Sequence, residues 1–321
     1  MSARGPVTVS PSAAVWVVEN ACWICGGSRL RPAAALEFDL GEYRRQDPEL
    51  AALSGSRLAL NRCEDCGFGQ PAALPALERY FDRMYDQRWS NDWITAEYHS
   101  TVKDLIFGRI LAALSRKLPG ERRRLLDVGA HAGRFISLAQ QAGWRVEGLE
   151  LNPQTAAFAA QATGARIHQV NVEHLEMGDQ FDAITLTDVL EHIPHPRRAL
   201  RRVRELLDPG GWIAVKVPCG PAQVTKERWR GRLVPGYEPT VADNLVHVSH
   251  FSACSLGRAL EDAGFVDVEI EAGAPELPPR HTGAQFLSRV LRLTVFRLAG
   301  VIPRGLDSPL CLNLQAYARA R

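Results

Sequence analysis

Residues 122–153, RRRLLDVGAHAGRFISLAQQAGWRVEGLELNP, decide the fold. The apolar run at 125–128 predicts a short buried strand, Gly129 and Gly133 predict a turn, and the apolar spacing that follows predicts a helix. A second apolar run at 146–151 predicts another strand. Two strands joined in this way by a glycine-rich turn and a helix are typical of α/β proteins that bind a ligand at the carboxyl ends of their strands. We therefore expect an α/β sheet with helices on both faces.

Two acidic residues in this stretch indicate which ligand the turn binds. Glu150 closes the second predicted strand, where a carboxylate accepts hydrogen bonds from both hydroxyls of a ribose. Asp127 lies at the end of the first strand, and the bulky His131 stands where a dinucleotide-binding turn has glycine. Asp127 would repel a pyrophosphate but pair with an ammonium group. This pattern favours S-adenosylmethionine (SAM), which carries an ammonium group and a cationic sulfonium.

The same residues resemble a known family. LLDVGAHAGRF, residues 125–135, looks like the first motif of class I SAM-dependent methyltransferases, and GLELNP, residues 148–153, resembles their ribose-binding second strand. The resemblance covers most of 94–321 and implies a Rossmann-like sheet. Further similar segments are 181–218 for the fourth strand, its helix and the fifth strand, 247–270 for the last helix and sixth strand, and 309–320 for a closing antiparallel strand.

Carried over position by position, the resemblance implies a set of SAM contacts. Gly129, Ala130 and Gly133 would face the methionine end of SAM, and Asp127 would contact that end directly or through water. His131 belongs to the same loop and departs from the glycine that the family usually has there. The remaining implied contacts are Glu150 with the ribose hydroxyls, Leu151 beneath the adenine, Asn171 with the adenine amino group, Val172 through its backbone N–H, and Thr187 near the transferable methyl.

Four of the seven cysteines form two pairs, Cys22-x-x-Cys25 and Cys63-x-x-Cys66. Four thiolates in two such pairs suit a structural zinc ion with tetrahedral coordination, so we expect residues 1–75 to form a zinc-binding module. The segment between the pairs should fold out as a hairpin or insert. Similar modules precede several bacterial methyltransferases of sugar and natural-product pathways. The alternative is four reduced, unligated thiols, and a redox pair is disfavoured because neither lies between a strand and a helix.

Methylation of a hydroxyl also needs a group that accepts a proton. The segment DVLEH supplies Asp188, Glu191 and His192 after the fourth predicted strand, and it resembles an acidic-x-x-Glu-His segment that holds a divalent ion in ubiquinone-pathway O-methyltransferases. Asp188 and His192 are therefore candidate catalytic residues. The alternative is that the Glu-His pair only caps a helix.

A second candidate for the proton acceptor is His247. Sugar C-methyltransferases with a similar zinc module carry a Tyr-x-Glu-His run here, whereas this chain has Asn244 and Val246 in place of Tyr and Glu. Losing both partners favours O-methylation over C-methylation. We expect His247 to act as the base, and His250 to be structural ahead of a helix capped by Ser252.

Two further segments complete the predicted organisation. Residues 76–120 predict a helical connector or lid, with apolar residues at helical spacing from about Ile94 to Pro119-Gly120. Residues 121–321 form the predicted methyltransferase domain, which carries an amphipathic insertion at 281–303. This helix is too charged to span a bilayer. We expect either peripheral contact with a membrane through 283–302 or a lid or homodimer helix.

Composition narrows the function. The 321 residues carry 38 Lys+Arg and 36 Asp+Glu, a formal net charge of +2, which disfavours a nucleic-acid partner. The N-terminus lacks the pattern of a signal peptide, so we expect a cytoplasmic protein, at most peripheral at the inner face of the membrane. The leading interpretation is O-methylation of a small-molecule acceptor: a sugar, a polysaccharide precursor or a secondary metabolite. C- or N-methylation of a nucleotide sugar, RNA methylation and a non-catalytic SAM-binding module remain as alternatives.

Overall fold

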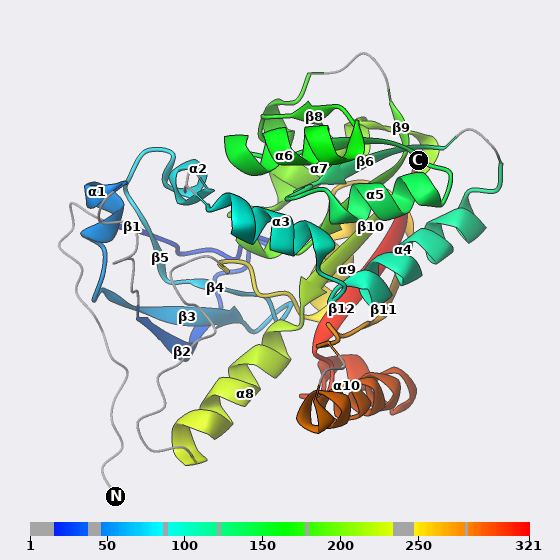
Figure 1. Ribbon diagram of the computed structural model, residues 1–321. Helices are drawn as coiled ribbons and strands as arrows, with labels where there is room; N and C mark the ends of the chain where they lie inside the picture. The colour runs from blue at the N-terminus through cyan, green and yellow to red at the C-terminus, as the bar shows by residue number, and fades with distance from the viewer. Residues whose placement is uncertain are drawn as a thin grey trace, which may run out of the picture.

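The computed structural model describes residues 16–37, 46–85, 89–120, 123–176, 180–233, 247–279 and 282–321. Its main feature is a seven-stranded sheet in the order β11-β12-β10-β9-β6-β7-β8 (Figure 1). Strand β12 runs antiparallel to both of its neighbours, and the remaining strands are parallel to one another, which confirms the expected α/β sheet and its closing antiparallel strand. The strands are β6 (Arg124–Val128), β7 (Arg145–Leu149), β8 (Ile167–His168), β9 (Phe181–Thr187), β10 (Leu207–Pro218), β11 (Phe265–Gly273) and β12 (Asn313–Ala320).

Helices cover both faces of this sheet, because successive residues of a buried strand point to opposite sides. Leu125 packs in one apolar cluster with Ile110 and Ile136, whereas the adjacent Leu126 packs in a second cluster with Leu200 and Leu256. One layer contains α3 (Asn91–His99), α4 (Asp104–Lys117), α5 (Arg134–Gln141) and α6 (Pro153–Thr163), and the other contains α7 (Arg197–Glu205) and α9 (Ala253–Asp262) (Figure 1).

The N-terminal part forms two small sheets, β2-β3-β4 and β1-β5. Strands β2 and β3 are antiparallel and lie between the two cysteine pairs, so the expected hairpin is confirmed. The elements are β1 (Trp16–Val18), β2 (Leu30–Glu37), α1 (Pro48–Ala51), β3 (Arg57–Cys63), β4 (Gly69–Pro71), β5 (Ala73–Pro75) and α2 (Tyr80–Tyr85).

This N-terminal part packs directly on the large domain. Gly69 and His250 exchange two backbone hydrogen bonds of 2.8 and 2.9 Å, and the rings of Phe68 and Phe251 meet edge-on with centroids 5.1 Å apart. Both phenylalanines belong to one apolar cluster that extends into the large sheet. The two parts therefore share a core.

Two further helices, α8 (Gly220–Leu233) and α10 (Gly283–Val301), project from the same side of the molecule (Figure 1). Helix α10 confirms the helix expected in the insertion, and it begins with a capping box between Thr282 and Gln285. Within the described residues, no helix combines the length and apolar content that crossing a membrane requires.

The structure corrects two predicted boundaries. The described part of the predicted connector at 76–120 contains three helices, α2, α3 and α4, and the helix expected from about Ile94 is divided because Ser100 takes an extended conformation that ends α3 before α4 begins. Asp208-Pro-Gly-Gly211 belongs to β10, and the register of β10 with β9 shifts between Leu207 and Trp212. The second strand ends at Leu149, so Glu150 is the first residue beyond it.

Candidate active site

The glycine loop lies at the carboxyl end of β6, where the order of the strands reverses between β6 and β9. Gly129 and Gly133 have φ of +77° and +87°, which glycine adopts without strain. A side chain at Gly133 would also meet Ala159 of α6 at 3.1 Å. The backbone N–H groups of Gly129 and Ala130 both donate to the carbonyl of Leu149, so the loop is tied to the end of β7.

Glu150 is held in place by the same loop. Its two carboxylate oxygens accept one hydrogen bond each, from the N–H of His131 at 2.8 Å and from the N–H of Asn152 at 2.9 Å. His131 has a φ of +48°, which is uncommon for a residue other than glycine. In this conformation its backbone N–H points at Glu150. Each oxygen of Glu150 keeps a second lone pair, so the carboxylate is oriented and still able to accept from a ligand.

Asp127 lies beneath the loop and is buried. One of its carboxylate oxygens accepts a hydrogen bond of 2.7 Å from the hydroxyl of Thr185 on β9. Burial raises the pKa of Asp127 to about 7; the hydrogen bond from Thr185 lowers it, and the nearby charge of Glu150 raises it further. A cation beside Asp127 would relieve this unfavourable environment.

The other predicted SAM contacts lie along the same edge of the sheet. Leu151 is half-buried just after β7, and Asn171 and Val172 follow β8. The amide oxygen of Asn171 accepts from the N–H of Glu173, so it caps a 3-10 turn at Val172–His174. Thr187 ends β9, and its buried hydroxyl has no hydrogen-bond partner among the described residues.

Helix α3 lies over the loop, a contact that the sequence did not identify. The ring of Trp93 meets the ring of His131 edge-on at 5.3 Å and stacks on Trp89 at 4.3 Å. The backbone N–H of Trp89 donates to the side chain of Gln154 at the start of α6. The two closely spaced tryptophans of the connector could have indicated this contact, because large aromatic rings are usually packed against another part of the protein.

Asp188 is paired with two lysines. It has a φ of +56° and lies between the ammonium groups of Lys103 from α4's N-terminus, at 2.7 Å, and of Lys216 from β10. Burial raises its pKa, but the charges of Lys216 and Lys103 outweigh burial and hold the pKa of Asp188 below its usual range. Asp188 is thus a poor proton acceptor. Lys216 is buried in an otherwise apolar strand, a pattern that signals a charged partner.

Glu191, His192 and His247 come together behind Asp188. One donor atom from each lies within 4.8 Å of the others, and the two imidazole rings meet edge-on at 4.8 Å. The N–H groups of Val248 and Ser249 both donate to the carbonyl of Glu191 at 2.9 Å, which holds the His247 segment against this turn.

The environment of this group favours neutral side chains. Burial and the charge of Asp188 raise the pKa of Glu191 to about 8, and both of its buried carboxyl oxygens lack a hydrogen-bond partner among the described residues. Burial, together with the neighbouring His192, lowers the pKa of His247 to about 3. His247 therefore carries a free lone pair at neutral pH. Asn244 and Val246, which replace the expected Tyr and Glu, lie outside the described residues.

His250 points away from this group, toward α8, where its Nδ1 lies 3.2 Å from the amide oxygen of Gln223. Ser252 caps α9 as expected, through a capping box with Ser255.

The four paired cysteines converge in the N-terminal part. Their sulfur atoms all lie within 4.8 Å of one another, with Cys22 and Cys66 3.6 Å apart and Cys25 and Cys63 3.5 Å apart. Zinc–sulfur bonds of about 2.3 Å in a tetrahedron give sulfur–sulfur distances of about 3.8 Å. Tight turns at Gly26 and Gly67, both with positive φ, bring each pair together. The donor set thus fits a zinc ion.

Comparison with known proteins gives one family match. A family model described as "Methyltransferase domain" matches residues 98–270, just over half of the chain.

Curated relatives carry a more specific description over a shorter segment. The chain is 35% identical over 98 residues to the "Ubiquinone biosynthesis O-methyltransferase" of Bordetella avium, which is 28% of this chain and 41% of that protein. It is 32% identical over 103 residues to the protein of the same description from Paracidovorax citrulli, which is 30% of this chain and 43% of that protein. The chain thus spans about two fifths of the length of these relatives.

Among solved structures, the chain resembles phosphoethanolamine N-methyltransferase 2 of Haemonchus contortus. The TM-score is 0.50 at 17% identity, and the match covers 79% of this chain and 63% of that one. At this identity the likeness concerns the fold alone.

Proposed function

The chain belongs to the methyltransferase-domain family, and from this membership we propose that it is a SAM-dependent methyltransferase that O-methylates a sugar, a polysaccharide precursor or a secondary metabolite. The observation that carries the proposal is Glu150, which the N–H groups of His131 in the loop and of Asn152 orient near the buried Asp127. Two carboxylates in these positions suit a ligand with ribose hydroxyls at one end and an ammonium group at the other.

In this proposal Glu150 accepts hydrogen bonds from the ribose hydroxyls, and Asp127 faces the ammonium group. Gly129, Ala130, His131 and Gly133 line the methionine end, and Thr187 lies toward the methyl group. Leu151, Asn171 and Val172 lie on the adenine side. SAM supplies an activated methyl group, so the protein mainly has to align the acceptor and take up its proton.

His247 is the proposed proton acceptor. Its pKa of about 3 makes it a weak base, but one with an unprotonated nitrogen at neutral pH. A hydroxyl oxygen that has gained a methyl group is a strong acid until it loses its proton, so a weak base is sufficient if it is positioned. His192 packs against His247 as a positioning residue. In this proposal Asp188 is not a base; it forms ion pairs with Lys103 and Lys216 and holds these two side chains in place.

A second candidate arrangement is a divalent cation held by Glu191, His192 and His247. The observation that favours it is the carboxyl group of Glu191, which is buried with no hydrogen-bond partner among the described residues. A cation would stabilise its charged form, and neutral imidazoles are good ligands for divalent transition metals. Full turnover after chelation, with activity still lost in a His247→Ala variant, would favour the base over the cation.

Cys22, Cys25, Cys63 and Cys66 are the proposed ligands of a structural zinc ion. Four cysteines fill a tetrahedral site, so the metal would hold the N-terminal fold and leave no position open for substrate.

The experiment that tests the function has two steps. Calorimetric titration with SAM measures whether the cofactor binds. Incubation of the protein with SAM and a metabolite extract then identifies the acceptor by a mass increase of one methyl group. SAM binding without any methylated product would instead favour a non-catalytic SAM-binding module. Retention on RNA at physiological salt, with methylation of that RNA, would favour the RNA methyltransferase alternative.

A further inference from the structure

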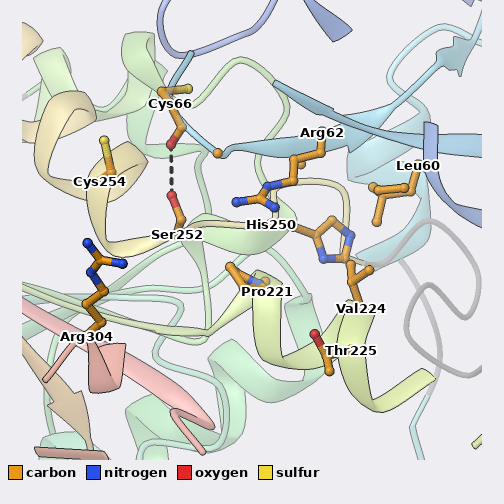
Figure 2. Close-up of a pocket in the computed structure, with 14 residues that line it drawn as sticks. Leu60, Arg62, Cys66, Pro221, Val224, Thr225, His250, Ser252, Cys254 and Arg304 are labelled. Carbon is orange, nitrogen blue, oxygen red and sulfur yellow. Dashed lines mark hydrogen bonds between the residues drawn. The ribbon is translucent and has the colours of Figure 1, made fainter. Parts of the chain in front are cut away.

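A pocket of about 540 Å³ lies between the N-terminal part and the large domain (Figure 2). Its walls come from β3, from the start of α8, from the segment 250–254 that leads into α9, and from the turn after α10. This volume lies within the range of small-molecule sites. None of the residues implied in SAM binding lines it, so it is separate from the cofactor loop.

The pocket is positively charged. Arg62 of β3 and Arg304 of the turn after α10 both line it, and no Asp or Glu in the described part of the chain does (Figure 2). Among the described residues, neither guanidinium group forms an ion pair or a hydrogen bond. The side chain of Arg62 is exposed, and a Cβ placed on Gly67 would lie 3.5 Å from Nη2 of Arg62 and 2.9 Å from the hydroxyl of Ser252, so both groups border the space at Gly67. Two unpaired cations in one pocket lower their energy when an anion binds between them.

The N-termini of two helices add to the positive charge of the pocket. Helix α8 begins at Gly220 and helix α9 at Ala253, and the first residues of both line the pocket. The N-terminus of a helix carries a partial positive charge and stabilises anions.

The remaining wall has a different character. Leu60 and Val224 give it an apolar surface, and His250 lies beside them (Figure 2). Because Nδ1 of His250 faces the amide oxygen of Gln223, Nδ1 carries the hydrogen and Nε2 is left as an acceptor. Nε2 is buried and has no partner among the described residues. A ligand hydroxyl could supply the missing donor.

We propose that this pocket binds the phosphoryl end of a phosphorylated, hydroxyl-bearing ligand. Arg62 and Arg304 pair with the phosphate oxygens, and Leu60 and Val224 contact the less polar part of the ligand.

If the protein is the methyltransferase proposed above, the ligand of this pocket is the methyl acceptor itself; this step rests on the proposed function. His247 lies three residues before His250, and a chain of three residues spans at most roughly 10 Å. The segment 247–250 is anchored at Glu191 by one end and at Gly69 by the other. The backbone of this segment joins the pocket wall to the proposed base, so in this proposal a sugar phosphate or nucleotide sugar held by its phosphate extends along the segment toward His247.

Calorimetric titration tests the pocket with inorganic pyrophosphate and with uridine diphosphate. Both should bind, and uridine diphosphate should bind more tightly because it also covers the apolar wall. The double variant Arg62→Gln, Arg304→Gln should bind both at least 10-fold more weakly. Arg116→Gln, which removes an exposed arginine of α4, is the matched control and should bind both like the wild type. Equal affinities of the double variant and the wild type, or no binding to the wild type, would overturn the proposal.

Two further measurements separate this proposal from the proposed function. SAM affinity should be unchanged in the double variant, and a Glu150→Gln variant should lose SAM affinity while it keeps its affinity for pyrophosphate. If the phosphorylated ligand is the acceptor, its KM should rise at least 10-fold in the double variant while kcat is unchanged. An unchanged KM would overturn the acceptor assignment, whereas loss of pyrophosphate binding would still support the pocket.

Discussion

At the scale of single residues, the site depends on carboxylates in three different environments. Glu150 is oriented by two backbone N–H groups, Asp127 is buried with one hydroxyl, and Asp188 is paired with two lysines. Burial raises the pKa of Asp127, whereas the two lysines hold the pKa of Asp188 below its usual range, so carboxyl groups of the same chemistry differ in their protonation.

Replacing Glu150 by glutamine should weaken SAM binding by roughly 10- to 100-fold, because hydrogen bonds from the ribose hydroxyls to a charged acceptor are lost. The change keeps the size of the side chain, so the melting temperature should change little. Glu261→Gln, at an exposed position of α9, is the control. Unchanged affinity for SAM in the Glu150 variant would remove this residue from the cofactor site.

SAM binding should depend on pH through Asp127. Its pKa of about 7 in the free protein should fall when the ammonium group of SAM pairs with it, so binding below pH 7 releases a proton. The affinity for SAM should therefore decrease as the pH falls from about 7 to 5, and it should also decrease above about pH 8, where the amino group of SAM loses its charge. Asp127→Asn should abolish the decrease at low pH. Calorimetry in two buffers of different ionisation enthalpy measures the proton release directly.

Replacing His247 by alanine should lower kcat by at least roughly 100-fold, the usual contribution of a positioned base. SAM affinity should stay within about twofold, because the proposed cofactor contacts lie on other segments. His174→Ala, at an exposed position, is the control. Full turnover by the His247 variant with intact SAM binding would assign the proton to another acceptor.

Among the secondary-structure elements, helix α10 exposes an apolar face for which the structure shows no partner among the described residues. It exposes Phe286, Leu287, Leu291 and Val301. Arg289 and Arg292 donate hydrogen bonds to the carbonyls of Pro278 and Glu276, so these arginines attach the helix to the protein. The exposed surface of α10 thus combines these apolar side chains with the exposed Arg292 and Arg297.

The predicted contact of 283–302 with a membrane has a direct test. If α10 binds a lipid surface, the protein should co-sediment with vesicles that contain anionic lipid, and a Leu287→Glu, Leu291→Glu variant should stay in solution. The dimer alternative predicts instead that the wild type elutes as a dimer and the same variant as a monomer. Equal sedimentation of both proteins with vesicles would contradict membrane contact through this face.

At the scale of the whole molecule, the N-terminal part and the large domain are coupled through one apolar cluster and through the Gly69–His250 backbone pair. The proposed phosphoryl pocket lies at this junction and takes Arg62 from one part and Ser252 from the other. Unfolding of the N-terminal part should therefore also disrupt the proposed phosphoryl pocket.

Removing zinc tests this coupling. The purified protein should contain about one zinc ion, and a chelator strong enough to extract it should lower the melting temperature of the whole protein in a single transition. Metal binding to the folded state stabilises it by mass action. A Cys63→Ser, Cys66→Ser variant should show the lower melting temperature without chelator. Cys254→Ser, at an exposed cysteine outside the cluster, is the control. No bound zinc and no effect of chelation would indicate four unligated thiols.

Local patterns in the sequence predicted the glycine loop, the oriented Glu150, the hairpin between the cysteine pairs and the Ser252 cap. These features depend on residues near one another in the chain, where turn geometry and hydrogen bonding are set by local residue types. The contacts of Lys103 and Lys216 with Asp188 could not be predicted, because they join segments separated by 85 and 28 positions.

The α/β sheet, the glycine loop and the two cysteine pairs follow from the sequence alone, because strand periodicity, glycine positions and cysteine spacing are local features of the chain. Only the tertiary structure decided that Asp188 is neutralised by lysines, that His247 joins Glu191 and that Arg62 shares a pocket with Arg304. Each of these depends on which distant side chains meet and how deeply they are buried. Burial and distance between charges, not residue type alone, set the protonation and the binding capacity of a site.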